Sequence, residues 1–529
     1  MKQFRQFVCA ACVVMGGLTG WVEAQNAPAA HVFFKVELAK SAPGPVNGRL
    51  LVFAKPGKGD NEVDMNEFHP GESWIAAMDV DHLVPGESVE MDADAMAYPK
   101  PFSAMPAGDY EVQAVLDVEH TYNYKGRTPT DWISAVVPLV HWSPASAEAT
   151  LTLLNHPEEN PQRVEAFAKA RGSVKTGAIE EQEMVSPALS KFWGRPVSVR
   201  SWVVLPPGYA EHAEEKYPTV YWTHGFGGSQ DSDLMSAVEI RNRMVRGAMP
   251  PMIWVMLDES CPQGTHEFAD SANNGPWGTA LTAEFIPMIE TKYRMDARPT
   301  GRFLNGHSSG GWATLQLQVN YPQVFGGTWS TSPDPSDFHD FTGPDLYAPY
   351  ANLYRRVDGS AYPIMRMKGK VVATLEQFAQ MERVIGPYGG QITSFEWVFS
   401  PRSDSGAPKP MFDRASGDVD PAVVAYWHEH YDLAFVTEKN WAKDADMLRG
   451  RIRLVVGTAD TFYLDGAAHR FEARLKALGA EPHFRYLEGR THFDLYGVDK
   501  DPRGMFDEIG AEMYAVARPG SGWKKTTTP

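Results

Sequence analysis

Apolar runs alternate with helix-like segments through the second half of the chain. The short apolar runs cover residues 217–222, 302–305, 451–457 and 483–487. Two intervening segments, residues 311–319 and 467–478, repeat their apolar residues at helical spacing. Strands alternating with helices in this way are typical of a parallel sheet covered by helices on both faces. We therefore expect a doubly wound α/β domain over residues 196–520.

Residues 31–154 follow a different pattern. Apolar and polar positions alternate over short runs, which clusters of Gly, Pro and Asp separate. The clearest runs are residues 32–38, 49–54, 110–116 and 149–153. Because no long amphipathic helix interrupts them, we predict an all-β sandwich with jelly-roll-like connections. Residues 155–195 are polar with some helical character, and they are predicted to form a linker.

A long segment, residues 333–450, lies between two of the predicted strands of the α/β domain. It is far longer than a strand connection needs, and segments of this length usually form lids or small subdomains. It is rich in Tyr and Trp, whose rings can stack on sugars or aryl groups or can fill a core. We expect a cap-like insertion that supplies walls of a pocket or packing, and none of the catalytic groups.

The pentapeptide at residues 306–310, Gly-His-Ser-Ser-Gly, lies between a predicted strand and a predicted helix. A serine in this setting lies on a sharp turn with its hydroxyl exposed, the arrangement called a nucleophile elbow. The flanking glycines avoid the Cβ clashes that such a turn would create. Gly-x-Ser-x-Gly also arises by chance in Gly-rich turns, but the strand before it and the helix after it favour Ser308 as a nucleophile.

A nucleophilic serine needs a base and an acid that orients the base. Asp460 follows the apolar run 451–457, and His492 lies in the loop after the run 483–487. Both therefore fall at the carboxyl ends of predicted strands, the edge where open α/β sheets build their sites. Asp460 could instead cap the following helix, with Asp465 as the second candidate acid, and His492 could be an ordinary loop histidine. His469, inside a helix, and His483, at a strand start, are weaker candidates for the base.

The oxyanion formed when a serine attacks a carbonyl group needs two hydrogen-bond donors. The run 217–222 leads into a glycine-rich loop over residues 223–228, which can turn its N–H groups inward. We assign the donors to the backbone amides of Phe226 and Ser309. The alternative is a plain surface turn.

Several of these segments together resemble a known family. They are Leu-Pro-Pro-Gly-Tyr at 205–209, His-Gly-Phe-Gly-Gly at 224–228 and Gly-His-Ser-Ser-Gly-Gly at 306–311. They resemble the esterase D type of the α/β-hydrolase superfamily, which includes formylglutathione hydrolases and feruloyl, acetylxylan and enterochelin esterases. The resemblance implies an α/β-hydrolase fold that acts on carboxylic esters, and the order Ser, Asp, His is the order of that fold. It also suggests that His224, His266 and Trp277 contact the substrate at the mouth of the site.

The N-terminus has the pattern of an export signal. Two basic residues precede an apolar run over residues 7–21, and small residues end it at Ala24. This pattern predicts a signal peptide over residues 1–24 that is cleaved, and a periplasmic or secreted protein without a membrane anchor. Two of the three cysteines lie in the signal, which leaves Cys261 alone and rules out an internal disulfide in the mature chain.

Charge and motifs exclude several classes of partner. The formal net charge of −17 argues against binding to nucleic acid or to anionic membrane surfaces. The chain contains neither a P-loop nor a dinucleotide-binding motif after a strand, so we expect no nucleotide cofactor. The His428-Glu429-His430 sequence lacks metal-protease spacing and is interpreted as a solvated helix face, so no metal site is expected.

Three functions are consistent with these features. The first is an exported serine esterase acting on acylated glycans, with acetyl or feruloyl groups, or on related esters. The second is hydrolysis of a siderophore lactone, which the acidic charge of the chain disfavours because that ligand is anionic. The third is a non-catalytic glycan-binding protein on a hydrolase scaffold, against which the complete set of catalytic residues argues.

Overall fold

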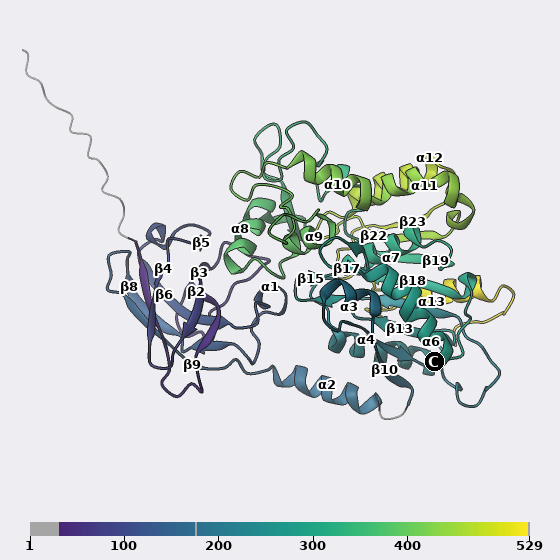
Figure 1. The fold of residues 1–529 in the computed structure, drawn as a ribbon, viewed down its shortest axis with the longest axis horizontal. Coiled ribbons are helices and arrows are strands. Elements are labelled where there is room, and N and C mark those ends of the chain that lie inside the picture. Colours follow the sequence, from purple (N-terminus) through teal and green to yellow (C-terminus); the bar gives the residue numbers. More distant parts are fainter. Residues whose placement is uncertain (1–30, 175–176, 527–529) are drawn as a thin grey trace, which may run out of the picture.

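The computed structural model describes residues 31–174 and 177–526 of the chain. Its strands form an N-terminal sheet of nine strands, a C-terminal sheet of eight and three short two-stranded pairs. Figure 1 shows two lobes, one around each large sheet. None of the helices in the described ranges combines the length and apolar character that crossing a membrane requires. The predicted export signal, residues 1–24, lies outside the described residues.

The N-terminal lobe is built from strands, in agreement with the all-β prediction for residues 31–154. They are β1 (Phe33–Leu38), β2 (Val46–Pro56), β3 (Trp74–Leu83), β4 (Ser88–Asp92), β5 (Ala97–Tyr98), β6 (Gly108–Asp117), β7 (Trp132–Ser134), β8 (Val137–Trp142) and β9 (Ala149–Asn155), with the short helices η1 (Phe102–Ala104) and α1 (Tyr122–Lys125).

These strands form one continuous sheet in the order β4-β1-β9-β7-β6-β2-β3-β5, and β8 also pairs with β6. The sandwich prediction assumed two separate sheets. They are joined because β6 pairs with β2 along one edge and with both β7 and β8 along the other. Alternate residues such as Val36, Val52 and Ala114 fill a shared core.

The C-terminal sheet has the strand order β10-β11-β13-β12-β18-β19-β22-β23. Its strands are β10 (Ile179–Val185), β11 (Ser198–Val204), β12 (Thr219–Thr223), β13 (Ile253–Leu257), β18 (Arg302–His307), β19 (Gly327–Thr331), β22 (Ile452–Gly457) and β23 (His483–Leu487). From β13 to β23 all neighbours are parallel, and β11 runs antiparallel to β13. Every residue of β12, β13 and β19 is buried, as expected for strands covered on both faces.

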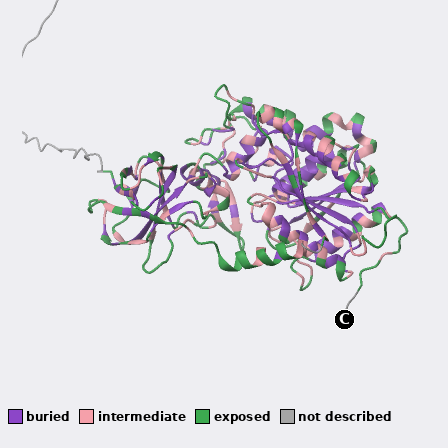
Figure 2. Cartoon of the chain, turned by 60° about the horizontal axis from the view of Figure 1, so that its bottom comes forward, coloured by how far each residue is buried: buried purple, intermediate pink, exposed green. Residues whose placement is uncertain are grey.

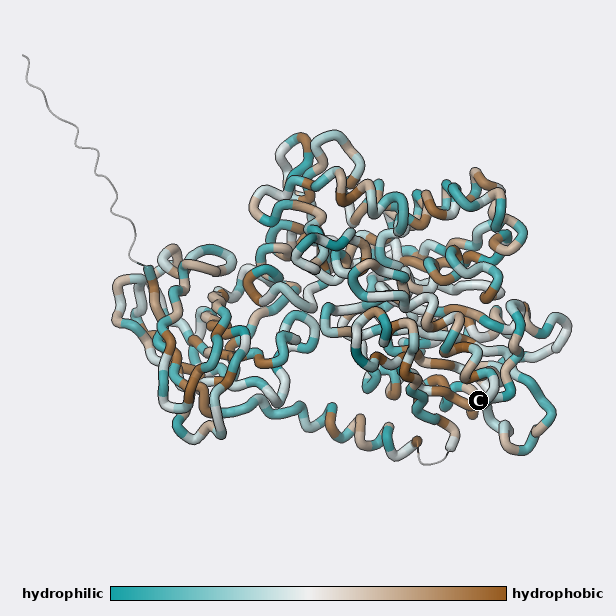
Figure 3. Tube along the Cα trace, in the orientation of Figure 1, coloured by the Kyte–Doolittle hydropathy of each residue, from teal (hydrophilic) through white to brown (hydrophobic). Residues whose placement is uncertain are grey.

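Helices cover both faces of this sheet, which agrees with the doubly wound prediction. One face packs on α4 (Gln230–Val245) and α13 (Met505–Ala517). The other face packs on α6 (Ile286–Lys292), α7 (Ser309–Asn320) and α12 (Asp465–Ala477). Figure 2 shows buried residues concentrated in the strands, and Figure 3 shows hydrophobic residues in both sheets.

Several short elements lie between β13 and β18. They are β14 (Ser260–Cys261), β15 (Gly264–Thr265), β16 (Asp270–Ser271), β17 (Gly275–Pro276), α5 (Trp277–Thr279), η2 (Ala280–Phe285) and η3 (Pro299–Gly301).

The segment predicted as a linker, residues 155–195, holds three ordered elements. They are α2 (Pro161–Val174), β10 and α3 (Pro187–Trp193). Only α2 spans the two lobes, and most of its residues are exposed (Figures 1 and 2). The C-terminal sheet thus begins at Ile179, earlier than the predicted residue 196. The sequence obscures β10 because it is an edge strand that carries glutamates at two of its three exposed positions.

The insertion between β19 and β22 is a folded subdomain. It contains η4 (Phe338–Asp340), β20 (Pro363–Met367), β21 (Lys370–Thr374), α8 (Leu375–Ile385), α9 (Gln391–Phe399), α10 (Pro421–Tyr431) and α11 (Leu433–Leu448). Many of its large aromatic residues, including Tyr354, Phe399 and Trp427, are buried in a core shared with α7, and others, such as Tyr347 and Trp441, pack partly buried against it. They therefore serve mainly as packing. The helix α11 lies on α7 and α12 and belongs to the layer that covers the sheet.

Candidate active site

Ser308 occupies a strained turn between β18 and α7. Its φ of 60° and ψ of −126° lie in a region that non-glycine residues rarely adopt, at a cost of about 1–3 kcal/mol. Neighbouring glycines permit the turn: a Cβ on Gly306 would overlap the carbonyl oxygen of Gly310, and a Cβ on Gly310 would overlap that of His224. The local chain thus has the geometry of a nucleophile elbow, with the serine side chain at its apex.

Asp460 lies just beyond the end of β22 and is fully buried. Its carboxylate accepts hydrogen bonds from His492 Nδ1, at 2.9 Å, and from the backbone N–H of Phe462, at 2.9 Å. Burial alone would raise the pKa of Asp460, but the hydrogen bond and the charge of His492 outweigh it and hold that pKa below its usual range. An ionised carboxylate can only accept hydrogen bonds, so His492 carries a proton on the Nδ1 that faces Asp460. In the neutral imidazole, the lone pair on Nε2 is then free to act as a base.

The imidazole of His492 lies at the same sheet edge as the elbow. Its ring centroid is 4.4 Å from that of His307, the residue before Ser308, and the ring is almost completely buried. Burial and the neighbouring His492 lower the pKa of His307 to about 3, so His307 is neutral there. Phe462 meets the ring of His492 edge-on at 4.9 Å. The fold thus gathers Ser308, Asp460 and His492 beyond the carboxyl ends of parallel strands.

The weaker candidates for the acid and the base lie away from the contact between Asp460 and His492. Asp465 begins α12 and pairs with Arg366 at 3.3 Å. His469 stacks on Tyr486 at 3.8 Å between ring centroids, and His483 begins β23 at the end of the strand opposite to His492. Within the described residues, no hydrogen bond or ion pair joins any of the three to Asp460 or His492.

The two predicted oxyanion donors flank the elbow. Ser309 is the first residue of α7, so its N–H belongs to the free amino end of the helix. Its buried hydroxyl donates to Asp334 at 2.6 Å. The loop carrying Phe226 passes directly over the serine, because a Cβ on Gly225 would lie 2.9 Å from Ser308 Cβ. The loop that carries Phe226 and the start of α7 that carries Ser309 thus both lie next to Ser308.

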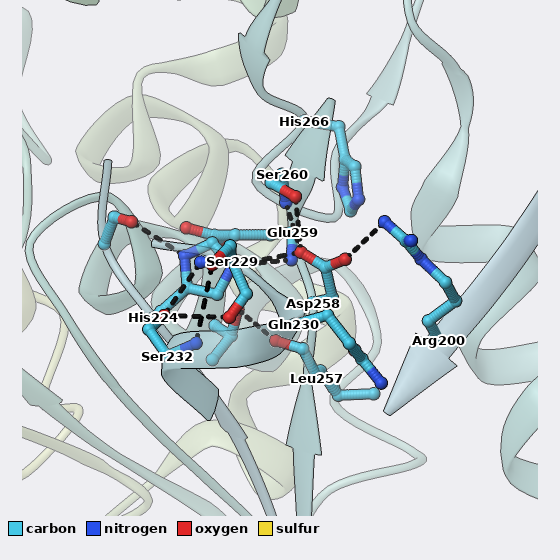
Figure 4. Close-up of polar contacts among 12 residues, drawn as sticks. Arg200, His224, Ser229, Gln230, Ser232, Leu257, Asp258, Glu259, Ser260 and His266 are labelled. Carbon is cyan, nitrogen blue, oxygen red and sulfur yellow. Dashed lines mark hydrogen bonds and ion pairs between the residues drawn. The ribbon is translucent and has the colours of Figure 1, made fainter. Parts of the chain in front are cut away.

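His224 lies among polar groups that include Asp258, Glu259 and Ser260 (Figure 4). It is buried, its Nδ1 contacts the carbonyl oxygen of Gly225 at 2.7 Å, and its Nε2 lies 3.3 Å from Asp258, which Arg200 also pairs with at 2.6 Å. Burial disfavours its charge, but the carboxylates around it outweigh burial and raise the pKa of His224 to about 10. The predicted contact with substrate becomes a supporting role, because the ring is held inside the protein between the Gly225 carbonyl oxygen and Asp258.

The same region holds a possible metal-ligand set. His224, Asp233 and Asp258 are all buried, with candidate ligand atoms within 4.8 Å of one another. Nε2 of His224 already accepts the backbone N–H of Glu259 at 3.1 Å and lies 3.3 Å from the Asp258 carboxylate, so protein groups already surround this nitrogen. A second set, His31, Asp92 and Asp94, lies near the surface and is partly exposed.

His266 and Trp277 also lie in the interior. Their rings stack 3.5 Å apart at 5°, and Trp277 Nε1 donates to the carbonyl oxygen of Asn274 at 2.9 Å. Burial lowers the pKa of His266 to about 3. The His266 ring is thus completely buried, whereas Trp277, also largely buried, lines a surface pocket together with Trp193 and Cys261.

Arg366 is a site residue that sequence reasoning missed. It belongs to β20 of the insertion, and its Nε and Nη2 donate to the carbonyl oxygens of Asp460 (2.8 Å) and Thr458 (3.1 Å). Its backbone N–H donates to Thr461 at 2.9 Å. The insertion therefore holds the acid loop, contrary to the expectation that it supplies only walls or packing. No local signal could reveal this contact, because 94 residues separate Arg366 from Asp460.

Comparisons with known proteins place the chain among esterases. A family model described as "Putative esterase" matches residues 191–494. Two proteins of Mycobacterium tuberculosis, Esterase MT1326 of strain CDC 1551 / Oshkosh and Esterase Rv1288 of strain ATCC 25618 / H37Rv, are each 33% identical over 153 residues. That stretch is 28% of this chain and 32% of each relative, so the match spans about a third of their length.

Solved structures of low identity are also similar. A ferulic acid esterase matches with a TM-score of 0.38 and 15% identity, covering 64% of this chain and 97% of that one. An S-formylglutathione hydrolase from Staphylococcus aureus matches with a TM-score of 0.38 and 11% identity, covering 64% of this chain and 98% of that one.

Proposed function

Because the chain belongs to the esterase family whose model it matches over residues 191–494, we propose that it is a serine hydrolase of carboxylic esters. The observation that carries the proposal is the 2.9 Å contact between Asp460 and His492 beside the strained turn of Ser308. Neither feature serves folding alone: the turn costs stability, and the acid is buried as an anion.

In the first half of the proposed reaction, Ser308 Oγ attacks the ester carbonyl carbon while His492 Nε2 takes its proton. The carbonyl π electrons move to oxygen, and the N–H groups of Phe226 and Ser309 stabilise the resulting oxyanion. As the tetrahedral intermediate collapses, the bond to the alcohol oxygen breaks. His492 returns the proton to that oxygen, and the alcohol leaves an acylated Ser308.

In the second half, water replaces the alcohol. His492 Nε2 takes a proton from water, whose oxygen attacks the acyl carbon. Collapse of this second intermediate releases the carboxylic acid and restores the Ser308 hydroxyl with the proton from His492. Asp460 stays ionised throughout and stabilises the imidazolium in both steps.

We extend the proposal to the substrate and the compartment. Phe493, next to the catalytic base, is 67% exposed, which favours an ester with an apolar or ring-bearing group. Acylated glycans carrying acetyl or feruloyl groups meet that description, and the N-terminal export pattern agrees with a periplasmic or secreted enzyme. A siderophore lactone is less suited, because its anionic groups would meet a chain of net charge −17.

The test is covalent labelling of the mature chain with a small fluorophosphonate, together with a hydrolysis screen. The screen covers short aryl esters, acetylated and feruloylated polysaccharides and a siderophore lactone. Wild type should be labelled, Ser308→Ala should not, and Ser405→Ala, which removes an exposed serine of the insertion, should label like wild type. A wild-type chain that resists labelling would favour the non-catalytic glycan-binding alternative.

A further inference from the structure

The N-terminal lobe is docked on the catalytic lobe. The outer face of β2, β3 and β6 presents residues such as Leu51, Phe53 and Val115, which pack against Val384 and Ile385 of α8. All of these side chains are almost completely buried. In Figure 1, α8 lies between the two lobes. The unbroken apolar run of β2 agrees with this packing, because both of its faces are covered.

Polar contacts fix the orientation of the docked lobe. Arg49 Nη2 donates to the carbonyl oxygen of Val384 at 2.8 Å. Asn123 Nδ2, from α1, donates to the carbonyl oxygens of Gly386 at 2.9 Å and Tyr388 at 3.1 Å. A domain held by directional bonds and a buried apolar patch has a defined position relative to the active site, unlike a module on a flexible tether.

This position brings Phe68 of the N-terminal lobe to the catalytic base. The ring of Phe68 meets that of Phe493 edge-on at 5.7 Å, and Phe493 follows His492 directly. Phe462, next to the acid loop, lies 5.9 Å from Phe493 and 4.9 Å from His492. Three phenylalanine rings from distant segments thus gather beside the imidazole. We call Phe68, Phe462 and Phe493 the aromatic wall.

A second contact lies on the oxyanion side. The carbonyl oxygen of Tyr124, in α1, would be 3.7 Å from a Cβ on Gly227, the residue after the Phe226 donor. The ring of Tyr124 packs so closely on Gly389 of the insertion that a Cβ there would overlap it. The N-terminal lobe therefore contacts the active site at two places, beside the base and beside the oxyanion loop.

The chemistry of the reaction decides which part of a substrate the aromatic wall faces. His492 must protonate the departing alcohol oxygen, so the alcohol part of the ester lies on the base side of the tetrahedral intermediate. Phenylalanine rings bind flat apolar faces, either an aryl ring or the C–H face of a pyranose. We propose that the N-terminal lobe, through Phe68, completes the site that binds a ring-bearing alcohol part of the ester. This inference rests on the proposed function and specifies its substrate.

The test compares three acetate esters that differ only in the alcohol. They are ethyl acetate, without a ring, benzyl acetate, with an aryl ring, and an O-acetylated methyl xyloside, with a pyranose. In Phe68→Ala, kcat/KM for the ring-bearing ester that the wall accepts should fall about tenfold, mainly through KM, which corresponds to about 1.4 kcal/mol. For ethyl acetate, kcat/KM of Phe68→Ala should change less than about twofold. Phe68→Tyr keeps an aromatic ring, so its kcat/KM for the ring-bearing ester should stay close to that of wild type.

Phe33→Ala provides the control, because Phe33 is a surface phenylalanine of the same lobe, on β1. Thermal midpoints and fluorophosphonate labelling of all variants should match wild type. An equal loss on all three esters would overturn the inference by showing that Phe68 acts through the catalytic groups or the fold. Unchanged kinetics on all three would overturn it by showing that the wall does not reach the substrate.

A measurement without turnover separates this inference from the proposed function. Saturation-transfer NMR reports binding of benzyl alcohol and of methyl xyloside, the products of the ring-bearing esters. Wild type should bind at least one of them, and Phe68→Ala should lose that signal. If wild type hydrolyses no ester but binds benzyl alcohol or methyl xyloside in a Phe68-dependent way, the proposed function is wrong, whereas the binding role of the aromatic wall is supported. If neither product binds to wild type, the proposal that the aromatic wall binds the alcohol part of the ester is wrong.

Discussion

Replacing Asp460 with Asn should inactivate the enzyme without unfolding it. The Asn carbonyl can still accept the hydrogen bond that Asp460 accepts from Phe462. The amide NH2 group would take the place of the oxygen that lies 2.9 Å from His492 Nδ1. Two donors would then face each other, and the imidazole would have to move its proton to Nε2 to relieve the conflict.

The magnitude follows from that tautomer. With Nε2 protonated, His492 has no lone pair toward Ser308 and cannot act as its base. Loss of the correct tautomer in a triad costs about 10⁴ in turnover, equivalent to ~5.5 kcal/mol of transition-state stabilisation. Because the mutant side chain has nearly the same shape, we expect a thermal midpoint close to that of wild type.

The assay is steady-state hydrolysis of 4-nitrophenyl acetate, with Asp465→Asn as the matched control. Asp465 pairs with Arg366, and among the described residues it makes no hydrogen bond or ion pair with His492, so its variant should keep activity within about threefold. The reasoning is refuted if Asp460→Asn keeps more than about a tenth of wild-type turnover. The reverse pattern between the two variants would make Asp465 the acid.

Three further predictions concern the nucleophile, the insertion and a buried carboxyl. Ser308→Ala should lose about 10⁶ in turnover. Ser308→Gly should lose activity as well, but its unfolding free energy, measured in urea, should rise by ~1 kcal/mol because glycine tolerates the positive φ. An unchanged urea midpoint for Ser308→Gly would argue against backbone strain at this residue. Arg366→Met should lower kcat at least tenfold with little change in KM, and Arg366→Lys should recover part of it; a pure KM effect would place Arg366 in substrate binding. Burial raises the pKa of Asp334 to about 6, so its protonation stabilises the native state at acidic pH, and that stabilisation is lost as the pH rises from about 4 to 6. Relative to Asp334→Asn, wild type should therefore lose ~3 kcal/mol of unfolding free energy between pH 4 and pH 7, and a difference that does not vary with pH would contradict the raised pKa.

The catalytic sheet and the positions of the three catalytic candidates could be predicted from local sequence. Ser308 and Asp460 follow apolar runs that are mostly buried, and His492 follows the partly exposed edge strand β23; such runs are recognisable without any knowledge of their neighbours. Parallel strands end at a common edge, so the strand pattern alone was enough to expect the three residues together. Four of the N-terminal strands, β1, β2, β6 and β9, were likewise visible as alternating runs, but their union into one sheet through β6 was not.

Tertiary structure decided what surrounds these residues. His266 and Trp277 form a buried stack, Arg366 reaches the acid loop from the insertion, and Phe68 reaches Phe493 from another lobe. These contacts join segments that are far apart in the chain, and a contact of that kind leaves no periodic pattern in either segment. Local periodicity records which face of a strand or helix is buried, because burial repeats with the geometry of the element. It does not record which partner covers that face, because any apolar surface of suitable shape lowers the free energy by a similar amount.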